Sequence, residues 1–542
     1  MERNWITRGR RACRNALLLM AALPLLAITA CASSNEDTGG GQPESLKVLV
    51  PIQGDVLDPT RVTVSGLGPV LIALEPLMRF QADGTFEPAL ATEMETPTPT
   101  TYVYTIRPGV TFWDDTPLTA EDVVFSLNLH AAPESESLNH PFWLGVTSIE
   151  ATADDQVTIT LAEPDAQFVY AIATAPIVSK AFYDENAKTV GTPETLNMGT
   201  GPYEFSSFRP SSQTTYTANP TYWGPEPAYE KLQVDTVSDD ATRLAAIQSG
   251  EFDAIYDIPL SQLSSYTGID GFETAEPAKD ASIYKFNFDM TKPPFNDIHL
   301  RRAFIMAIDR ETIVDGTLGG HATLAPTLVP PDMMKTVADP DEVDSVYAEL
   351  EEGLTHDPAG AQAEMAQSAT PDGLEVTLLV TGSNPNLSLI AQTAAQDLEK
   401  IGITLDIKEV DDNTFYNAVY FEHTTDGVSL EVFSGTNPDP ANIPNYALAS
   451  QFGLPKGGQG SNLSDFDDPE VDRLLAESQA LATDDPQRGS LVLDALRAAQ
   501  ADPPFMPLAF PELYAGAGGG LEITGFTSFW WMTSWPDAIA AP

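Results

Sequence analysis

The residue types that most often carry out chemistry are few and scattered in this chain of 542 residues. The sequence contains no G-x-S-x-G nucleophile elbow, no H-E-x-x-H zinc motif and no P-loop. Its six histidines lack the spacing of a metal site: His130, His140, His299, His321, His356 and His423. Carboxylates are so abundant that a pair of them carries almost no information. We therefore expect no catalytic residue, no metal site and no cofactor, and a protein that is not an enzyme.

Cys31 is the residue at which we expect covalent chemistry. The chain has two cysteines, Cys13 among arginines and Cys31 at the end of the apolar run 16–30. A basic start followed by an apolar run too short to cross a bilayer is typical of a secretory signal peptide. The segment Ile28-Thr29-Ala30-Cys31 resembles the bacterial lipobox. This resemblance implies that residues 1–30 are removed and that Cys31 carries a lipid.

The start of the chain leaves two alternatives open. A signal peptide cut near Ala30 without lipidation would leave Cys31 as a free thiol, which is unusual on a secreted protein. Arg10-Arg11 allows twin-arginine export as well as general secretion. Residues 31–45 are small and polar, and we interpret them as a flexible linker between the lipid and the folded body. The expected location is therefore extracytoplasmic, at the membrane through a lipid anchor.

The charge of the chain is strongly acidic. Its formal net charge is −51, and because residues 1–30 hold five arginines and one glutamate, residues 31–542 carry about −55. Such a surface repels nucleic acid and anionic lipid, so we exclude nucleic acid as a partner. Solvated acidic faces without a specific partner explain the charge adequately.

The elements that must position any site follow an α/β pattern. Tyr102, Tyr104 and Ile106 alternate along the chain and would lie on one face of a strand. Thr119 and Asp122 have the spacing of a variant capping box at the start of a helix. Farther along, the strand pattern 374–380, a helix ending near Gly402 and a second strand at 403–410 predict a βαβ unit with two parallel strands.

Several ordered segments are similar to the oligopeptide-, dipeptide- and nickel-binding proteins of bacterial ABC importers, the extracellular solute-binding proteins of family 5. Each segment is modest alone, but their joint order is specific and covers nearly all of 46–542. The segments are "IRPGVTFWDDTPLTAEDVVFSL" (106–127), "GTGPYEF" (199–205), "NPTYWG" (219–224), "PPFNDIHLRRAFIMAIDRE" (293–311) and "DPEVDRLLAES" (468–478).

The resemblance implies an α/β, two-lobed periplasmic-binding-protein fold of the large class with an extra subdomain. Two hinge strands would join lobes that close over a solute. The expected division is a signal peptide at 1–30, a linker at 31–45, lobe I at 46–290 with an inserted subdomain at about 75–185, lobe II at 291–505 and a C-terminal return to lobe I at 506–542.

The implied function is capture of a peptide or similar small solute and its delivery to an ABC importer. The implied partners are the solute, the permease and ATPase subunits and, through the lipid, the membrane; the protein itself is expected to be a monomer. Two alternatives stay open: a sensor or peptide-signal receptor without a permease, and a secreted hydrolase that uses paired carboxylates.

Two positions bear on the solute. In peptide-binding relatives, a stretch like "FSGTNPDP" carries an aspartate for the peptide ammonium, and Thr436 stands at that position here. Thr381 stands where dipeptide binders place an arginine for the ligand carboxylate. Because a buried ammonium without a counter-charge is costly, these changes argue against a specialist for dipeptides. A longer peptide bound through its backbone, a sugar or another neutral solute remain open.

The remaining candidate contacts come from the expected crossing strand, from the loop around Thr436 and from the C-terminal tail. Aromatic side chains suit a solute cavity because they stack and offer dispersion contacts, although packing in the core explains each of them equally well. The candidates are Tyr284, Asn287, Phe433, Asn437, Asp439 and Trp531.

Overall fold

The computed structural model describes residues 44–542 except 52, 63–65, 238, 280–281, 383, 458–459 and 484. The chain divides into two units, residues 1–41 and 42–542, and every described residue belongs to the second. Cys31, the expected signal peptide and nearly all of the expected linker lie outside the described residues. In the described part of the chain, no helix combines the length and apolar character required to span a bilayer.

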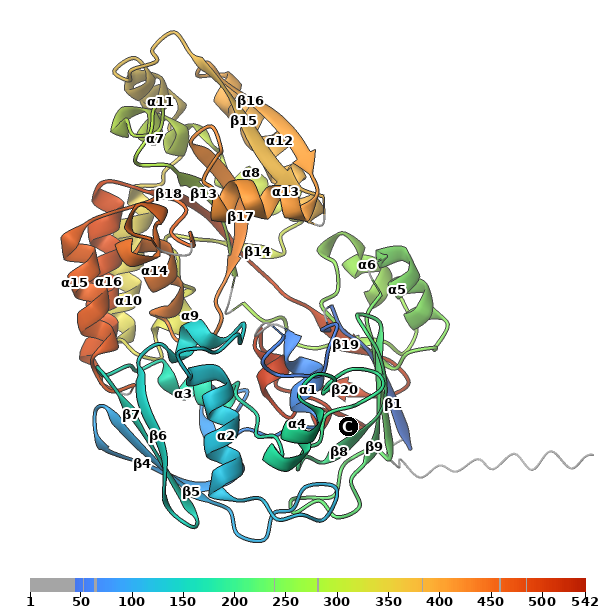
Figure 1. Ribbon diagram of the computed structural model, residues 1–542. Coiled ribbons are helices and arrows are strands. Elements are labelled where there is room, and N and C mark those ends of the chain that lie inside the picture. Colours follow the sequence, from blue (N-terminus) through green and yellow to red (C-terminus); the bar gives the residue numbers. More distant parts are fainter. Residues whose placement is uncertain are drawn as a thin grey trace, which may run out of the picture. The chain divides into compact units, whose positions relative to one another are not determined.

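A seven-stranded mixed sheet organises the first lobe (Figure 1). Its order is β12-β19-β11-β1-β10-β9-β8, and β1 runs parallel to both of its neighbours. Leu46 and Val48 of β1 are fully buried, as expected for a central strand. The strands are β1 (Ser45–Leu49), β8 (Tyr203–Arg209), β9 (Gln213–Ala218), β10 (Lys231–Asp235), β11 (Ala254–Tyr256), β12 (Glu273–Thr274) and β19 (Ala515–Ala517).

Two of the motif segments meet at a buried carboxylate, that of Glu75. Its side chain is fully buried and accepts hydrogen bonds from Arg79 (3.0 Å), Thr200 (2.9 Å), Tyr222 (2.8 Å) and Trp223 (2.9 Å). Four donors offset much of the desolvation cost of the buried acid. The segments 199–205 and 219–224 are therefore both anchored to the same buried side chain.

Glycine is required in the first of these segments. A Cβ atom at Gly199 or Gly201 would lie 2.4 or 2.5 Å from the carbonyl oxygen of Ala73. The close backbone approach excludes any larger side chain.

A four-stranded antiparallel sheet, in the order β4-β5-β7-β6, forms a separate layer beside the first sheet. β5 (Thr101–Ile106) buries every second residue, as its sequence pattern predicts. The helix α2 (Ala120–Ala131) contacts this sheet, and Thr119 and Asp122 form the predicted capping box. The other elements of the layer are β4 (Ala91–Thr98), β6 (Val146–Ala153), β7 (Gln156–Leu161) and α3 (Phe168–Ala173).

The second lobe is built on the sheet β14-β18-β13-β17 and on the parallel pair β15-β16. β15 (Leu374–Thr381) and β16 (Ile403–Val410) are joined by α12 (Pro385–Glu399), which confirms the predicted βαβ unit. The strands of the larger sheet are β13 (Ser282–Phe288), β14 (Ala322–Leu324), β17 (Val428–Ser434) and β18 (Phe505–Pro511).

Helices surround the sheets of both lobes (Figure 1). In the first lobe they include α1 (Gly68–Leu71), α4 (Lys180–Asn186), α5 (Asp240–Gln248) and α6 (Leu263–Thr267). In the second lobe they include α7 (Ile298–Ala307), α9 (Pro331–Met334), α10 (Pro340–Glu352), α11 (Pro358–Met365), α13 (Asp412–Tyr416), α14 (Asn442–Leu448), α15 (Pro469–Gln479) and α16 (Gln487–Ala501).

Two chain segments connect the lobes. One leads from β12 to β13, the other from β18 to β19, and they pair through Ala278 and Leu513, whose backbone groups exchange hydrogen bonds of 2.8 and 3.0 Å. β13 pairs with β17 and β18 of the second lobe, although its residues precede the expected boundary at residue 290. The exact lobe limits stay a prediction.

Candidate functional site

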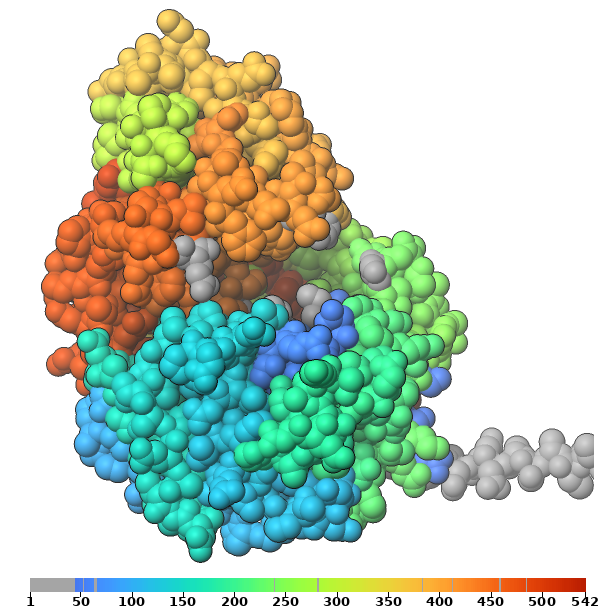
Figure 2. Space-filling view, in the orientation of Figure 1, coloured from blue at the N-terminus to red at the C-terminus, as the bar shows by residue number. Residues whose placement is uncertain are grey.

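The loop 435–441, between β17 and α14, carries three of the predicted contact residues. The surface of the described chain is hollowed between the blue-to-cyan segments of the first lobe and the orange segments of the second (Figure 2). The loop's own side chains fold it: Asn437 Oδ1 accepts from the backbone of Asp439 (3.0 Å), and Asp439 Oδ1 accepts from that of Ala441 (2.9 Å). These local bonds are the turn chemistry expected of Asn and Asp.

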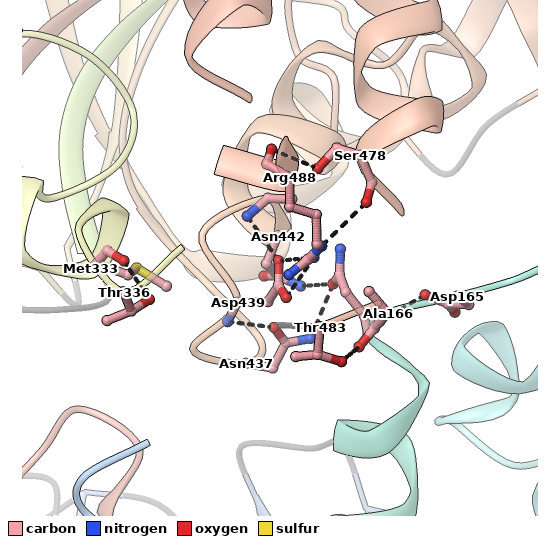
Figure 3. A network of polar contacts seen from close by, with 12 residues as sticks. Asp165, Ala166, Met333, Thr336, Asn437, Asp439, Asn442, Ser478, Thr483 and Arg488 are labelled. Atoms are coloured by element: carbon pink, nitrogen blue, oxygen red, sulfur yellow. Dashed lines mark hydrogen bonds and ion pairs between the residues drawn. The ribbon is translucent and has the colours of Figure 1, made fainter. Parts of the chain in front are cut away.

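Asp439 forms a buried ion pair rather than presenting a free carboxylate. Nη2 of Arg488 lies 2.8 Å from its Oδ1 and 2.7 Å from its Oδ2, and both side chains are 1% exposed. Arg488 Nε also donates to the carbonyl of Ser478 (3.2 Å; Figure 3). The pair ties the loop to α15 and α16.

Gln167, at the start of α3, joins the four-stranded layer of the first lobe to this loop and to the first residue of α14. Its Oε1 accepts from Nδ2 of Asn437 (3.2 Å) and from Nδ2 of Asn442 (2.9 Å). Beside it, the backbone oxygen of Ala166 accepts from Thr483 Oγ1 (3.4 Å; Figure 3). Segments more than 250 residues apart in the chain are thus held together by neutral hydrogen bonds.

A small cavity of about 180 Å³ lies against the loop, and Thr436 and Asn437 are among its lining residues. The backbone N–H of Thr436 donates to Asn442 Oδ1 (2.9 Å). Most of the polar groups in the wall are neutral, and five of them are side-chain amides: Gln167, Asn437, Asn445, Gln451 and Gln479. Nε2 of Gln167 is buried and lacks a hydrogen-bond partner among the described residues.

A larger cavity of about 1050 Å³ is lined by Pro438, Asp439 and Pro440 of the same loop. Asp439 and Arg488 contribute to its wall, and it shares Asp165 and Tyr170 with the small cavity. Burial raises the pKa of Asp165, whereas its hydrogen bond from the backbone of Gln167 lowers it. Asp165, Gln167 and Tyr170 were missed from the sequence, where "PDAQF" shows only a turn before an apolar run.

Asn287 belongs to a buried polar cluster in the second lobe. Its Nδ2 donates to Glu431 Oε1 (2.9 Å), which also accepts from Lys285 Nζ (2.6 Å). Lys285 contacts Asn287 Oδ1, and Tyr420 donates to the other oxygen of Glu431. Burial lowers the pKa of Lys285, and Glu431 opposes that shift. These contacts occupy the amide of Asn287 within the protein.

The other predicted contacts are packed into different parts of the fold. Tyr284 is 4% exposed, and its hydroxyl accepts from Asn386 (3.2 Å). Phe433 is buried, with Lys285 Nζ 5.0 Å from its ring centre. Thr381 ends β15 and is buried, whereas Trp531 is half-buried and packs on the core of the first lobe. The structure therefore brings together Thr436, Asn437 and Asp439, but not the whole predicted set.

The histidines take part in local contacts. In the described part of the chain, no three His, Cys, Asp or Glu residues are grouped so that they could hold a metal ion. Burial lowers the pKa of His130 to about 4, and its Nδ1 lies 2.7 Å from Ser137 Oγ. His423 contacts Asp465 (3.0 Å); although burial lowers its pKa, the hydrogen bond to that carboxylate and its charge raise the pKa overall.

Comparisons with known proteins bear on the family of this chain. Residues 85–453 match the family described as bacterial extracellular solute-binding proteins, family 5 Middle. The probable di/tripeptide-binding protein 5 of Pseudomonas aeruginosa is 28% identical over 530 residues, which cover 92% of this chain and 94% of that protein. Heme-binding protein A of Haemophilus influenzae is 27% identical over 464 residues, or 80% of each chain.

A solved structure shows the same fold. The periplasmic binding protein DppA of Helicobacter pylori, in complex with the peptide STSA, matches with a TM-score of 0.75 and 21% identity, over 92% of this chain and 98% of that chain. The two-lobed α/β fold predicted from the sequence is therefore confirmed.

Proposed function

Since this chain belongs to the family 5 bacterial extracellular solute-binding proteins, we propose that it captures a peptide or similar neutral, polar solute between its lobes and delivers it to an ABC importer. The matched relatives are described as binding proteins, for a di- or tripeptide in one case and for heme in another. Because these solutes differ widely in chemistry, membership of the family does not identify the solute, which depends on the residues of this chain.

The observation that carries the proposal is the contact of Gln167 in the first lobe with Asn437 of the loop 435–441 and with Asn442 at the start of α14 in the second lobe. The contact consists of two neutral hydrogen bonds, each worth about 1 kcal/mol. Bonds of this strength can be made and broken as the lobes open and close. A solute that adds contacts to both sides would shift the balance toward the closed form.

The polar wall of the small cavity suits a solute that offers carbonyl and N–H groups. Side-chain amides can both donate and accept, as a peptide backbone requires. The unpartnered Nε2 of Gln167 provides a donor for a carbonyl oxygen of the solute. Thr436 supplies no charge for a peptide ammonium, so we propose a peptide held by its backbone, or a neutral solute of similar polarity.

The surroundings of each predicted contact residue decide which role we propose for it. We propose that Thr436 and Asn437 meet the solute directly, because both line the small cavity. We propose that Asp439 shapes the loop, since its carboxylate is paired with Arg488. Direct contact with the solute stays a proposal for the other five residues: Tyr284, Asn287, Phe433, Thr381 and Trp531.

A lipid on Cys31 would keep the receptor beside its permease, because a tether raises the effective concentration of one partner near the other. We expect Cys31→Ala to move the protein from the membrane fraction to the soluble extracytoplasmic fraction. Membrane retention of the variant after a high-salt wash would contradict lipidation. A Cys13→Ala variant, which alters the other cysteine, is the matched control.

The experiment that tests the function is native mass spectrometry of the protein purified without denaturation from its own cells. We expect a bound solute that is released unchanged on unfolding, and whose re-addition raises the melting temperature. Chemical conversion of the added solute by the protein would contradict a binding function. The absence of any thermal shift with a peptide library and with the released material would contradict solute capture.

A further inference from the structure

The larger cavity has walls of a different character from the small one. Its side between β2 (Met78–Phe80), β3 (Phe86–Pro88) and α3 is aromatic. The rings of Phe86 and Tyr170 lie 5.1 Å apart and are tilted by 63°, and Tyr102 adds a third ring. Across from them, α9 contributes Met333. The volume of about 1050 Å³ is that of a site for a small organic molecule.

The charge in this wall is negative. Four carboxylates line the cavity, those of Asp83, Asp165, Asp332 and Asp439, against the single cation Arg488 among the described lining residues. Arg488 is already paired with Asp439. The charges of this pair cancel, so the other three carboxylates set the sign of the electrostatic potential that a ligand meets.

Asp165 is the acidic group best placed to meet a guest. It is partly exposed and lines the cavity beside Tyr170. Its Oδ1 accepts from the backbone of Gln167 (2.9 Å), so the carboxylate is held in place at the start of α3. The rings of Tyr170 and Phe86 line the same cavity as Asp165, and aromatic faces attract cations.

We propose that this cavity is a second binding site, which adjoins the solute site at Thr436 through Asp165 and Tyr170, and that it takes a small organic cation with an apolar or aromatic body. The aromatic and methionine side chains would receive the body, and Asp165 would pair with the ammonium. The walls come from both lobes, from α3 on one side and from α9 and the residues 480–483 on the other. This site goes beyond the proposed transport function and does not require it.

Isothermal titration with two probes of similar size tests the proposal. Phenethylamine is a cation at neutral pH, and 3-phenylpropionate is its anionic counterpart. We expect the amine to bind at least about tenfold more tightly than the acid, because the wall repels a carboxylate. Equal affinities, or binding of the acid alone, would overturn the proposal.

Two variants locate the binding. Asp165→Asn keeps an acceptor for the N–H of Gln167 but removes the charge, and we expect it to weaken phenethylamine binding about tenfold. Asp154→Asn, in the exposed turn between β6 and β7, is the matched control and should leave the affinity unchanged. Ala482→Trp places a large ring at an exposed position of the cavity wall, and we expect it to abolish binding.

Loss of binding must also be distinguished from misfolding of a variant. Far-UV circular dichroism and the melting temperature establish that each variant is folded. Binding of phenethylamine that is unaffected by both Asp165→Asn and Ala482→Trp would place the amine elsewhere and overturn the proposal. Because Ala482 lines the larger cavity and not the small one, binding of the peptide solute to Ala482→Trp reports on the site at Thr436. Loss of phenethylamine binding with retained peptide binding therefore distinguishes failure of one site from failure of the other.

Discussion

Asp439 and Arg488 form an ion pair in which each side chain is 1% exposed, with Nη2 of Arg488 within 2.8 Å of both carboxylate oxygens. Desolvation of two charges nearly offsets their attraction, so the intact pair adds little to stability. Removal of one partner is a different matter, because the other charge stays buried without compensation.

We expect Asp439→Asn or Arg488→Met alone to lower the free energy of unfolding by about 3–5 kcal/mol. The double variant should lose less stability than the sum of the two single losses, because it leaves no unpaired charge. Urea unfolding followed by circular dichroism measures these values. Additive losses in the double variant would show that the two residues are not energetically coupled.

Glu75 offers a comparison between a buried and an exposed partner of the same cation. Arg79 contacts Glu75, which is fully buried, and also Glu87, whose side chain is 49% exposed. We expect Glu75→Gln to cost about 2 kcal/mol, because four donors lose a charged acceptor. The control Glu87→Gln should cost under about 1 kcal/mol. Equal losses in thermal unfolding would contradict a special role for Glu75.

The hydrogen bonds of Gln167 should affect solute binding more than folding. In Gln167→Leu, the two amide donors of Asn437 and Asn442 lose their common acceptor, and we expect solute affinity to fall about fivefold to tenfold. Titration calorimetry with the co-purified solute measures the change. The exposed Gln362→Leu on α11 serves as control. Unchanged affinity in Gln167→Leu would remove the contact from the closure mechanism.

His130 should make stability depend on pH. Burial, with a smaller effect of the charge of His140, lowers the pKa of His130 from 6.5 to about 4. Between these values the unfolded chain binds the proton more readily than the folded one, so stability decreases as pH falls from 6.5 through 4. We expect a loss of about 2.5 kcal/mol between pH 7.5 and pH 4.5.

The measurement for His130 compares wild type with His130→Asn in urea at both pH values. The variant should be less stable at pH 7.5, but the difference should shrink at pH 4.5, because the variant carries no group to protonate. His356→Asn, at a partly exposed histidine, is the control. A difference that stays constant with pH would show that His130 titrates alike in both states.

Thr436 is the position at which a charge should change the choice of solute. We expect Thr436→Asp to strengthen binding of peptides with a free amino terminus about tenfold over their acetylated forms, because a carboxylate in the cavity wall can pair with the ammonium. Thr404→Asp, at an exposed position of β16, controls for the added charge. Identical preferences in wild type and Thr436→Asp would show that the loop does not meet the amino terminus there.

The sequence was sufficient where the relevant interactions are local. The capping box of Thr119 and Asp122 and the βαβ unit through α12 were predicted correctly, since caps and periodicity depend on neighbours a few residues apart. The ordered motif segments also identified the family and the two-lobed fold, because their glycines and aromatic residues serve the scaffold, as Gly199 and Tyr222 do.

Only the tertiary structure decided which polar groups are free to meet a solute. From the sequence, Asp439 and Asn287 were candidate contacts, yet Arg488, distant in the chain, pairs with the first, and Lys285 and Glu431 engage the second. Gln167 carried no signal, because its partners lie 270 and 275 residues away. Caps and turns depend on neighbouring residues, but the partners and the burial of a side chain depend on contacts that form only when distant segments meet.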